Sequence, residues 1–326
     1  MKTLFAPLLL FVCFFAFSTS AEDKKPTTAE HLQNVSVTIR AEGSFSSGEG
    51  SGVIFTRKDS KGNLVNFVWT AAHVIDNLRK ERKTLVNGSP KTLVEFKDPM
   101  VVKEIRQNGR TVGRLQMDAE VLKYSDADDG HDLALLRVRK FNFVKDTVTF
   151  YLDEDIPALG KDLLHVGSLL GQMGANSMTD GIYSQHGRLI KDLNKHVFDQ
   201  TTCTAFPGSS GGGVYSKSDA KYVGMLVRGA GEGFNLIVPI RRMKDYCEKH
   251  KIMWALDPSL EMPTEEDLKK MPIENTPQDK KDSEDAEKEA AKKMFPFMLR
   301  VYEKHSDGRP DFLKTKPQLL KTMEKH

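Results

Sequence analysis

The sequence predicts an all-β fold built from short antiparallel strands that form a barrel or a sandwich. Between about residues 35 and 238, brief apolar or alternating runs are separated by frequent turn residues. Glycines occur in pairs and triplets in the second half of this region. These features favour a barrel or sandwich over a sheet built from alternating strands and helices.

The expected strands are short and either apolar or alternating. They fall at residues 35–39, 53–55, 67–69, 133–138 and 200–205. A weakly alternating stretch at 101–121 contains Asn108-Gly109, a pair typical of a tight hairpin turn. Two helices are also predicted, a short one at about 74–80 and a longer one from 239 to about 251.

Composition limits the classes of partner. The chain has 326 residues, 39% hydrophobic and 29% charged, which suits a globular protein of about two domains. A net charge of +3 is too mild to indicate binding to nucleic acid or to an anionic membrane. The cysteines and histidines show no metal-ligand spacing, so we predict neither a metal nor a cofactor.

Residues 1–21 have the pattern of a cleaved secretory signal peptide. Lys2 precedes an apolar run at 4–17, and small residues follow it. The run is shorter than the ~20 residues of a membrane-spanning helix, although an uncleaved anchor remains the alternative. We therefore predict a secreted or periplasmic protein with a flexible segment at 22–34. In that oxidising compartment, Cys203 and Cys247 form either a disulfide or two buried thiols.

Two motifs carry a candidate base and a candidate acid. "TAAHV" places His73 where a strand ends, after small residues that leave room on the strand. "HDLALLRV" places Asp132 at the head of an apolar strand, where its carboxylate can accept a hydrogen bond from an imidazole N–H. His131 is expected to be a bystander.

A third motif, "PGSSGG", offers two candidate nucleophiles. Glycines beside a serine let a substrate carbonyl approach backbone N–H groups that can stabilise an oxyanion. If Ser210 attacks, its own N–H and that of Gly208 can form this hole. If Ser209 attacks, the residue two positions before it is Pro207, which has no N–H. The sequence therefore favours Ser210.

Taken in the order His, Asp, Ser, these motifs resemble those of the chymotrypsin-like serine proteases, particularly the HtrA/Deg-like branch. "GSGVIF", "SMTDGIYSQHGRL" and "VGMLVRGAGEGFNLIVPI" extend the resemblance over about residues 35–253. It implies two six-stranded antiparallel β-barrels, at 35–150 and 151–254, with a C-terminal helix. His73 and Asp132 would belong to the first barrel and Ser210 to the second.

The resemblance also implies an activity, a serine endopeptidase that hydrolyses polypeptides through an acyl-enzyme. Ser210 would attack, His73 would transfer the proton, and Asp132 would orient the imidazole. Thr204 would lie at the base of the primary specificity pocket, which disfavours a preference for Lys or Arg. Val227 and Arg228 would belong to the substrate-binding strand, with Arg228 either contacting an acidic substrate side chain or pointing to solvent.

The sequence also departs from the family pattern. Ser209 occupies the position of the acid that pairs with a newly cut N-terminus in digestive members, so that activation route is not expected. Residues 255–326 are too short and too charged for the usual PDZ domain. This tail is either a solvated, partly helical extension or a segment that docks on a partner or on the protein itself. The alternative function is a protease-like binding module with little activity.

Overall fold

The computed structural model describes residues 26–86, 89–107, 109–128, 130–190, 196–229 and 231–274. The predicted signal peptide and most of the predicted tail lie outside these residues. None of the helices in the described ranges is long and apolar enough to cross a membrane.

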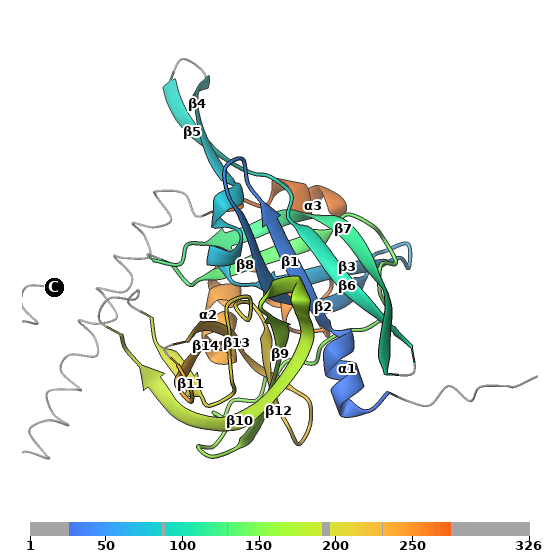
Figure 1. Cartoon of the computed structure of the whole chain (residues 1–326). Coiled ribbons are helices and arrows are strands. Elements are labelled where there is room, and N and C mark those ends of the chain that lie inside the picture. The colour runs from blue at the N-terminus through green and yellow to red at the C-terminus, as the bar shows by residue number, and fades with distance from the viewer. Residues whose placement is uncertain are drawn as a thin grey trace, which may run out of the picture.

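Two closed, six-stranded antiparallel barrels form the body of the protein, as the family resemblance implied (Figure 1). The first barrel consists of β1 (Ser36–Glu42), β2 (Ser47–Lys58), β3 (Leu64–Thr70), β6 (Met100–Gln107), β7 (Arg110–Ser125) and β8 (Leu133–Val138). The second barrel consists of β9 (Asp162–Leu169), β10 (Gly174–Arg188), β11 (Phe198–Thr201), β12 (Gly213–Ser216), β13 (Tyr222–Gly229) and β14 (Asn235–Pro239).

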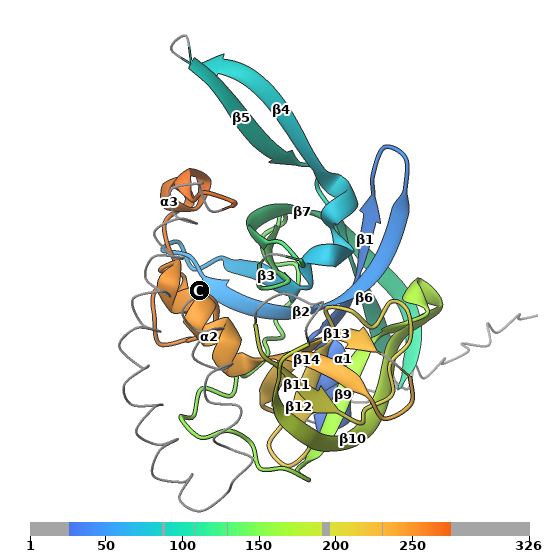
Figure 2. The same ribbon diagram turned by 90° about the vertical axis from the view of Figure 1, so that its left-hand side faces the viewer.

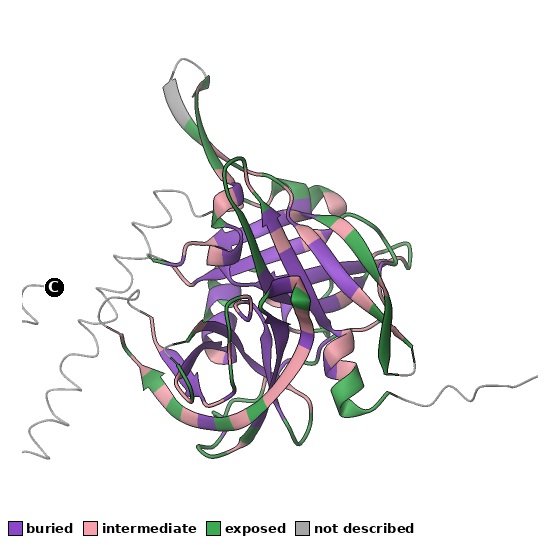
Figure 3. Ribbon diagram, viewed as in Figure 1, coloured by how far each residue is buried: buried purple, intermediate pink, exposed green. Residues whose placement is uncertain are grey.

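Buried residues occur along the strands of both barrels (Figure 3). The apolar ones among them belong to one core cluster that spans the two barrels. In the first barrel, the rings of Phe55 and Phe67 stack with their centroids 5.2 Å apart. Trp254 meets the ring of Phe67 edge-on at 4.9 Å. The predicted hairpin between β6 and β7 is confirmed, and Gly109 adopts the positive φ of 74° that such a turn requires.

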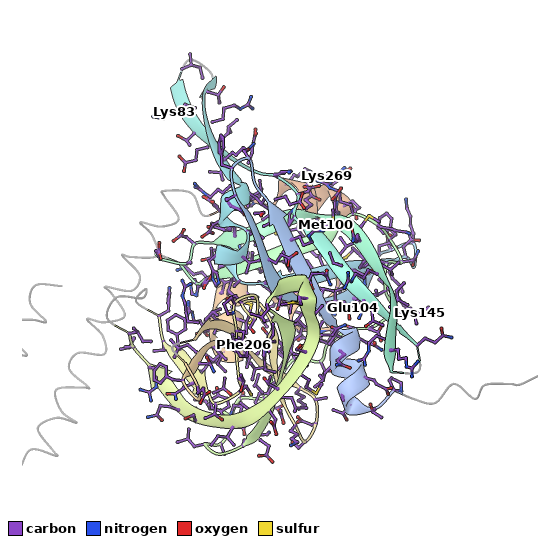
Figure 4. All side chains as sticks on the ribbon, in the orientation of Figure 1. Lys83, Met100, Glu104, Lys145, Phe206 and Lys269 are labelled. Atoms are coloured by element: carbon purple, nitrogen blue, oxygen red, sulfur yellow. The ribbon has the colours of Figure 1, made fainter. Side chains whose placement is uncertain are left out.

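The region between β3 and β6 differs from its prediction. Residues 74–80 were expected to form a helix, but two 3₁₀ turns, η1 (Ala72–Val74) and η2 (Asp76–Leu78), lead directly into a strand. That strand, β4 (Arg79–Val86), pairs with β5 (Ser89–Phe96) in a separate two-stranded sheet. The hairpin projects from the body (Figure 2), and Figure 4 labels Lys83 on it.

Three α-helices in the described part of the chain pack against the barrels. The predicted C-terminal helix is confirmed as α2 (Ile240–Lys249), which buries one face. The predicted flexible segment at 22–34 differs from the structure, because α1 (Thr28–Asn34) begins with a capping box between Thr27 and Glu30. The third helix, α3 (Glu265–Lys270), lies within the predicted tail.

The described part of the tail packs against the first barrel. The indole N–H of Trp69 donates to the carbonyl of Ala255 at 3.2 Å. The main-chain N–H of Tyr124 donates to the carbonyl of Ile273 at 2.9 Å. The packed chain therefore extends to about residue 274, beyond the predicted end of the second barrel at 254.

Leu268, in α3, is one of the buried apolar residues of this segment, and its replacement tests the packing. Leu268 is buried, whereas Leu260 in the same segment is 44% exposed. We expect Leu268→Ala to lower the free energy of unfolding by about 2–4 kcal/mol, because it removes a buried side chain and leaves a cavity. Leu260→Ala should change it by less than about 0.5 kcal/mol. Urea unfolding of both variants measures the difference, and equal effects would contradict the packing.

Candidate active site

His73 and Asp132 are in direct contact. His73 lies in the 3₁₀ turn η1 that follows β3, and Asp132 immediately precedes β8. The Nδ1 atom of His73 lies 3.0 Å and 2.9 Å from the two carboxylate oxygens of Asp132. The main-chain N–H of His73 also donates to Oδ1, at 3.1 Å. The carboxylate therefore fixes both the ring and the backbone of the histidine, and leaves Nε2 facing away from it.

The environment of Asp132 favours the charged carboxylate. The residue is only 1% exposed, and burial by itself raises its pKa. Hydrogen bonds from His73 and the nearby charges outweigh burial, so the pKa of Asp132 lies below its usual value. One of these charges is Arg228, whose Nη2 atom is 3.9 Å from Oδ2. Arg228 thus points toward the carboxylate, with about a third of its side chain exposed.

The turn that carries Asp132 is held by groups from elsewhere in the fold. Asp132 has a positive φ of 53°, which aspartate tolerates better than most residues do. The buried Arg242 of α2 donates from Nη2 to the carbonyl of His131 at 2.7 Å. His131 is partly buried, and its ring stacks on that of His196 with the centroids 4.0 Å apart. Arg242 was missed in the sequence because nothing there distinguishes it from other helical arginines.

Ser210 lies on the second barrel beside β13. Its hydroxyl donates to the carbonyl of Val227 at 3.3 Å. Within the described residues, no hydrogen bond joins this hydroxyl to His73. A Cβ atom on Gly50 would lie 2.6 Å from the side chain of Val74 and 3.1 Å from the Ser210 carbonyl oxygen. The residue next to His73 and the backbone of Ser210 therefore flank the same glycine.

Ser51 of β2 attaches the serine loop to the first barrel. Its N–H donates to the carbonyl of Ser210 at 2.7 Å, and its hydroxyl donates to the carbonyl of Gly208 at 2.7 Å. The Ser51 hydroxyl in turn accepts the N–H of Ser168 in β9 at 2.7 Å. Ser51 was not singled out from the sequence, although it lies inside the quoted "GSGVIF" motif.

The two adjacent serines have different environments. Ser209 is fully buried, and its hydroxyl accepts the N–H of Phe206 at 3.1 Å. Ser210 is partly exposed. Of these two hydroxyls, only that of Ser210 therefore faces a region that a substrate can reach.

The peptide bond between Pro207 and Gly208 is oriented so that the N–H of Gly208 is left without an acceptor among the described residues. The carbonyl of Pro207 accepts the N–H of Leu170 at 2.7 Å. In a trans peptide the N–H of the next residue, Gly208, points the opposite way. Among the described residues, no acceptor is bonded to the N–H of Gly208 or to that of Ser210. Gly208 has a φ of 93°, and a Cβ there would meet the Ser168 carbonyl oxygen at 2.4 Å, so only glycine fits.

The remaining predicted residues lie close to this loop. Thr204 is exposed, and its carbonyl accepts the hydroxyl of Thr179 at 2.9 Å. Val227 is buried in β13. Cys203 and Cys247 are both buried and free, which agrees with the alternative of two thiols. Burial raises the pKa of the Cys203 thiol to about 11, so this cysteine is not a reactive thiolate.

His165 is a buried histidine that contacts the carbonyl of Gly213, just after the serine loop. It is fully buried in β9; Nδ1 donates to the carbonyl of Gly213 at 3.0 Å, and Nε2 has no partner within the described residues. Protonation would place an unpaired charge in the interior, and burial lowers the pKa of His165 to about 4.

We expect the free energy of unfolding to fall as the pH is lowered from about 6.5 toward 4. In this window the unfolded chain binds a proton at His165 and the folded chain does not, which costs up to about 1.4 kcal/mol per pH unit. His165→Gln should reduce this slope. Urea unfolding at several pH values measures it, and equal slopes in both proteins would contradict the assignment.

A two-barrel fold with a histidine–carboxylate pair on one barrel and an exposed serine on the other defines the class of chymotrypsin-like serine proteases. The comparison with protein families agrees, since residues 50–225 match the trypsin-like peptidase domain. The chain belongs to this family. The matched region contains His73, Asp132 and Ser210.

Similar solved structures include two proteases. A serine endoprotease from Yersinia pestis is 21% identical, with a TM-score of 0.47, over 69% of this chain and 67% of its own. The HtrA-type protease AlgW, in a serine-to-alanine variant with a tripeptide, is 18% identical, with a TM-score of 0.50, over 71% of this chain and 65% of its own. This chain thus spans about two thirds of each protein. No curated protein sequence matches it.

Proposed function

We propose that the protein is a serine endopeptidase in which Ser210, His73 and Asp132 form the catalytic triad. The observation that carries this proposal is the pair of contacts between Nδ1 of His73 and the carboxylate of Asp132. These contacts fix the tautomer that leaves Nε2 free to accept a proton. Ser210 carries a partly exposed hydroxyl, and its carbonyl accepts the N–H of Ser51 from the first barrel.

The reaction begins with a rotation of the Ser210 side chain. Its hydroxyl leaves the Val227 carbonyl and donates to Nε2 of His73, a contact that a bound substrate favours. The oxygen then attacks the scissile carbonyl while His73 takes the proton, and Asp132 stabilises the imidazolium. His73 gives the proton to the leaving amine, and water hydrolyses the resulting acyl-enzyme by the same steps.

The oxyanion that forms in each step is bound by the N–H groups of Gly208 and Ser210. The bond from Leu170 to the Pro207 carbonyl supports this role, because it keeps that carbonyl out of the hole. Donors fixed in this way before the reaction begins stabilise the developing charge without reorganising.

Substrates are polypeptides, with the acyl part lying along β13. Thr204 forms the base of the pocket for the residue before the scissile bond, and its lack of charge favours an uncharged side chain there. Arg228 belongs to this strand, and its contact with Asp132 is long enough, at 3.9 Å, for a substrate carboxylate to compete for the guanidinium.

We also propose that the protein is exported, to the periplasm or outside the cell, through the signal peptide at 1–21. The tail beyond residue 274 docks on a partner or on the protein body. The rival function is a binding module that uses the protease fold without cleavage, with the tail as its interaction segment.

Covalent labelling separates these two functions. The protein is treated with a fluorophosphonate probe, the labelled peptide is identified by mass spectrometry, and casein cleavage is followed in parallel. Labelling on Ser210 together with cleavage supports the endopeptidase. A folded protein that is neither labelled nor active would favour the binding module.

A further inference from the structure

A pocket of about 870 Å³ is lined in part by Pro207 and Gly208 of the serine loop and by no residue of β13. The residues that line it come from the β1–β2 hairpin, from the loop after β9 and from the serine loop. They are Arg40, Glu42, Gly43, Ser44, Phe45, Ser46, Ser47, Gly48, Glu49, Leu170, Gly171, Pro207 and Gly208. Because Gly208 supplies an oxyanion donor in the proposed function, the pocket begins within a residue or two of the scissile bond.

The residues that line the pocket indicate which half of the substrate, before or after the scissile bond, it would contact. Ser210 contacts the carbonyl of Val227, and a Cβ on Gly229 would lie 4.0 Å from Ala205. The binding strand and the Thr204 region therefore lie together, on the acyl side. None of the lining residues belongs to either segment. The pocket thus faces the leaving half of the substrate, which follows the scissile bond.

Two large apolar side chains that line this pocket are exposed to solvent. Phe45, between β1 and β2, is fully exposed, and Leu170 is 53% exposed. Leu170 also has a φ of 62°, an uncommon conformation for leucine. Exposed apolar surface at the rim of a cavity is typical of a binding site.

The charged residues that line the pocket form ion pairs with one another or hydrogen bonds with the main chain. Arg40 pairs with Glu42 at 3.1 Å and with Glu49 at 3.2 Å. Glu49 also accepts the N–H of Gln172 at 2.7 Å, in the 3₁₀ turn η3 (Gly171–Met173) that follows Leu170. These groups fix the loop that carries Leu170, and the exposed apolar side chains are the part of the pocket that a ligand can cover.

We propose that this pocket binds a large apolar side chain in the first or second residue after the scissile bond, with Phe45 as its main contact. This inference rests on the proposed function and adds a selectivity for the leaving half of the substrate. Burial of such a side chain against Phe45 and Leu170 should favour it over glycine by about tenfold or more.

An acyl-transfer experiment tests the pocket separately from the acyl side. The acyl-enzyme is formed from one ester substrate, and Leu-Ala-amide, Ala-Leu-amide or Gly-Gly-amide is added to compete with water. The ratio of aminolysis to hydrolysis reports binding of the leaving half alone. In the unaltered protein, at least one leucine peptide should react about tenfold better than Gly-Gly-amide. Phe45→Ser should reduce this preference to less than about threefold, and Phe45→Leu should retain most of it.

Leu159→Ser is the matched control, because Leu159 is 55% exposed but does not line the pocket. It should leave the preference unchanged. Equal reaction of all three peptides, or a preference that survives Phe45→Ser, would overturn the inference and leave the peptidase assignment intact. Failure of the unaltered protein to form an acyl-enzyme would overturn the proposed function, and this inference with it.

Discussion

Ser210→Ala will lower kcat/KM for peptide hydrolysis by a factor of about 10⁵–10⁶ and abolish fluorophosphonate labelling. The replacement removes the hydroxyl that we propose as the nucleophile. It should leave the fold intact, because the Ser210 hydroxyl contributes to the described structure only a 3.3 Å hydrogen bond to the Val227 carbonyl. Active-site titration and steady-state kinetics on a casein-derived peptide measure the effect, and thermal unfolding checks the fold.

Ser209→Ala is the control for this variant, since it changes the same chemical group one residue away. Its hydroxyl is buried and accepts the N–H of Phe206, so its removal should cost about 1–3 kcal/mol of stability and still permit labelling. If instead Ser209→Ala abolished labelling and Ser210→Ala did not, the assignment of the nucleophile would be reversed.

Asp132→Asn will lower kcat by about 10⁴-fold while the protein stays folded. Asparagine tolerates the positive φ of 53° as well as aspartate does, and its oxygen can still accept the main-chain N–H of His73. Its NH₂ group, however, donates to Nδ1 and forces the proton onto Nε2. That nitrogen can then no longer accept the proton of Ser210.

Steady-state kinetics at neutral pH and circular dichroism check this expectation together. The comparison with Asp132→Ala is informative, because alanine disfavours the positive φ and should lower the melting temperature as well. An Asp132→Asn protein that kept more than about a tenth of the kcat would show that this carboxylate does not set the tautomer of His73.

The stretch at 74–80 shows where pattern alone fails. Val74, Ile75 and Leu78 are all buried, and their spacing suits one face of a helix. The same spacing is satisfied by two successive 3₁₀ turns that pack against the first barrel. Whether this segment forms an α-helix or two 3₁₀ turns depends on the barrel surface against which it packs. The sequence of a short segment does not specify that surface.

The tail shows a second kind of limit. Residues 255–274 are rich in charge, which left open either a solvated extension or a segment that docks on a partner or on the protein itself. In the structure two of these charges pair with the first-barrel side of the protein: Glu265 with Arg137 at 2.5 Å, and Glu274 with Arg79 at 2.5 Å. Whether such a charged segment packs therefore depends on oppositely charged residues more than a hundred positions away in the same chain.

The sequence by itself determined the all-β class, the hairpin between β6 and β7 and the choice of Ser210 over Ser209 as candidate nucleophile. These follow from local properties, namely alternation, turn chemistry and the absence of an N–H on Pro207. Only the tertiary structure decided that Arg228 faces Asp132, that Ser51 joins the two barrels, and that a pocket opens beside Gly208. Each of these depends on contacts between residues far apart in the chain, which the folded barrels bring together and no local pattern records.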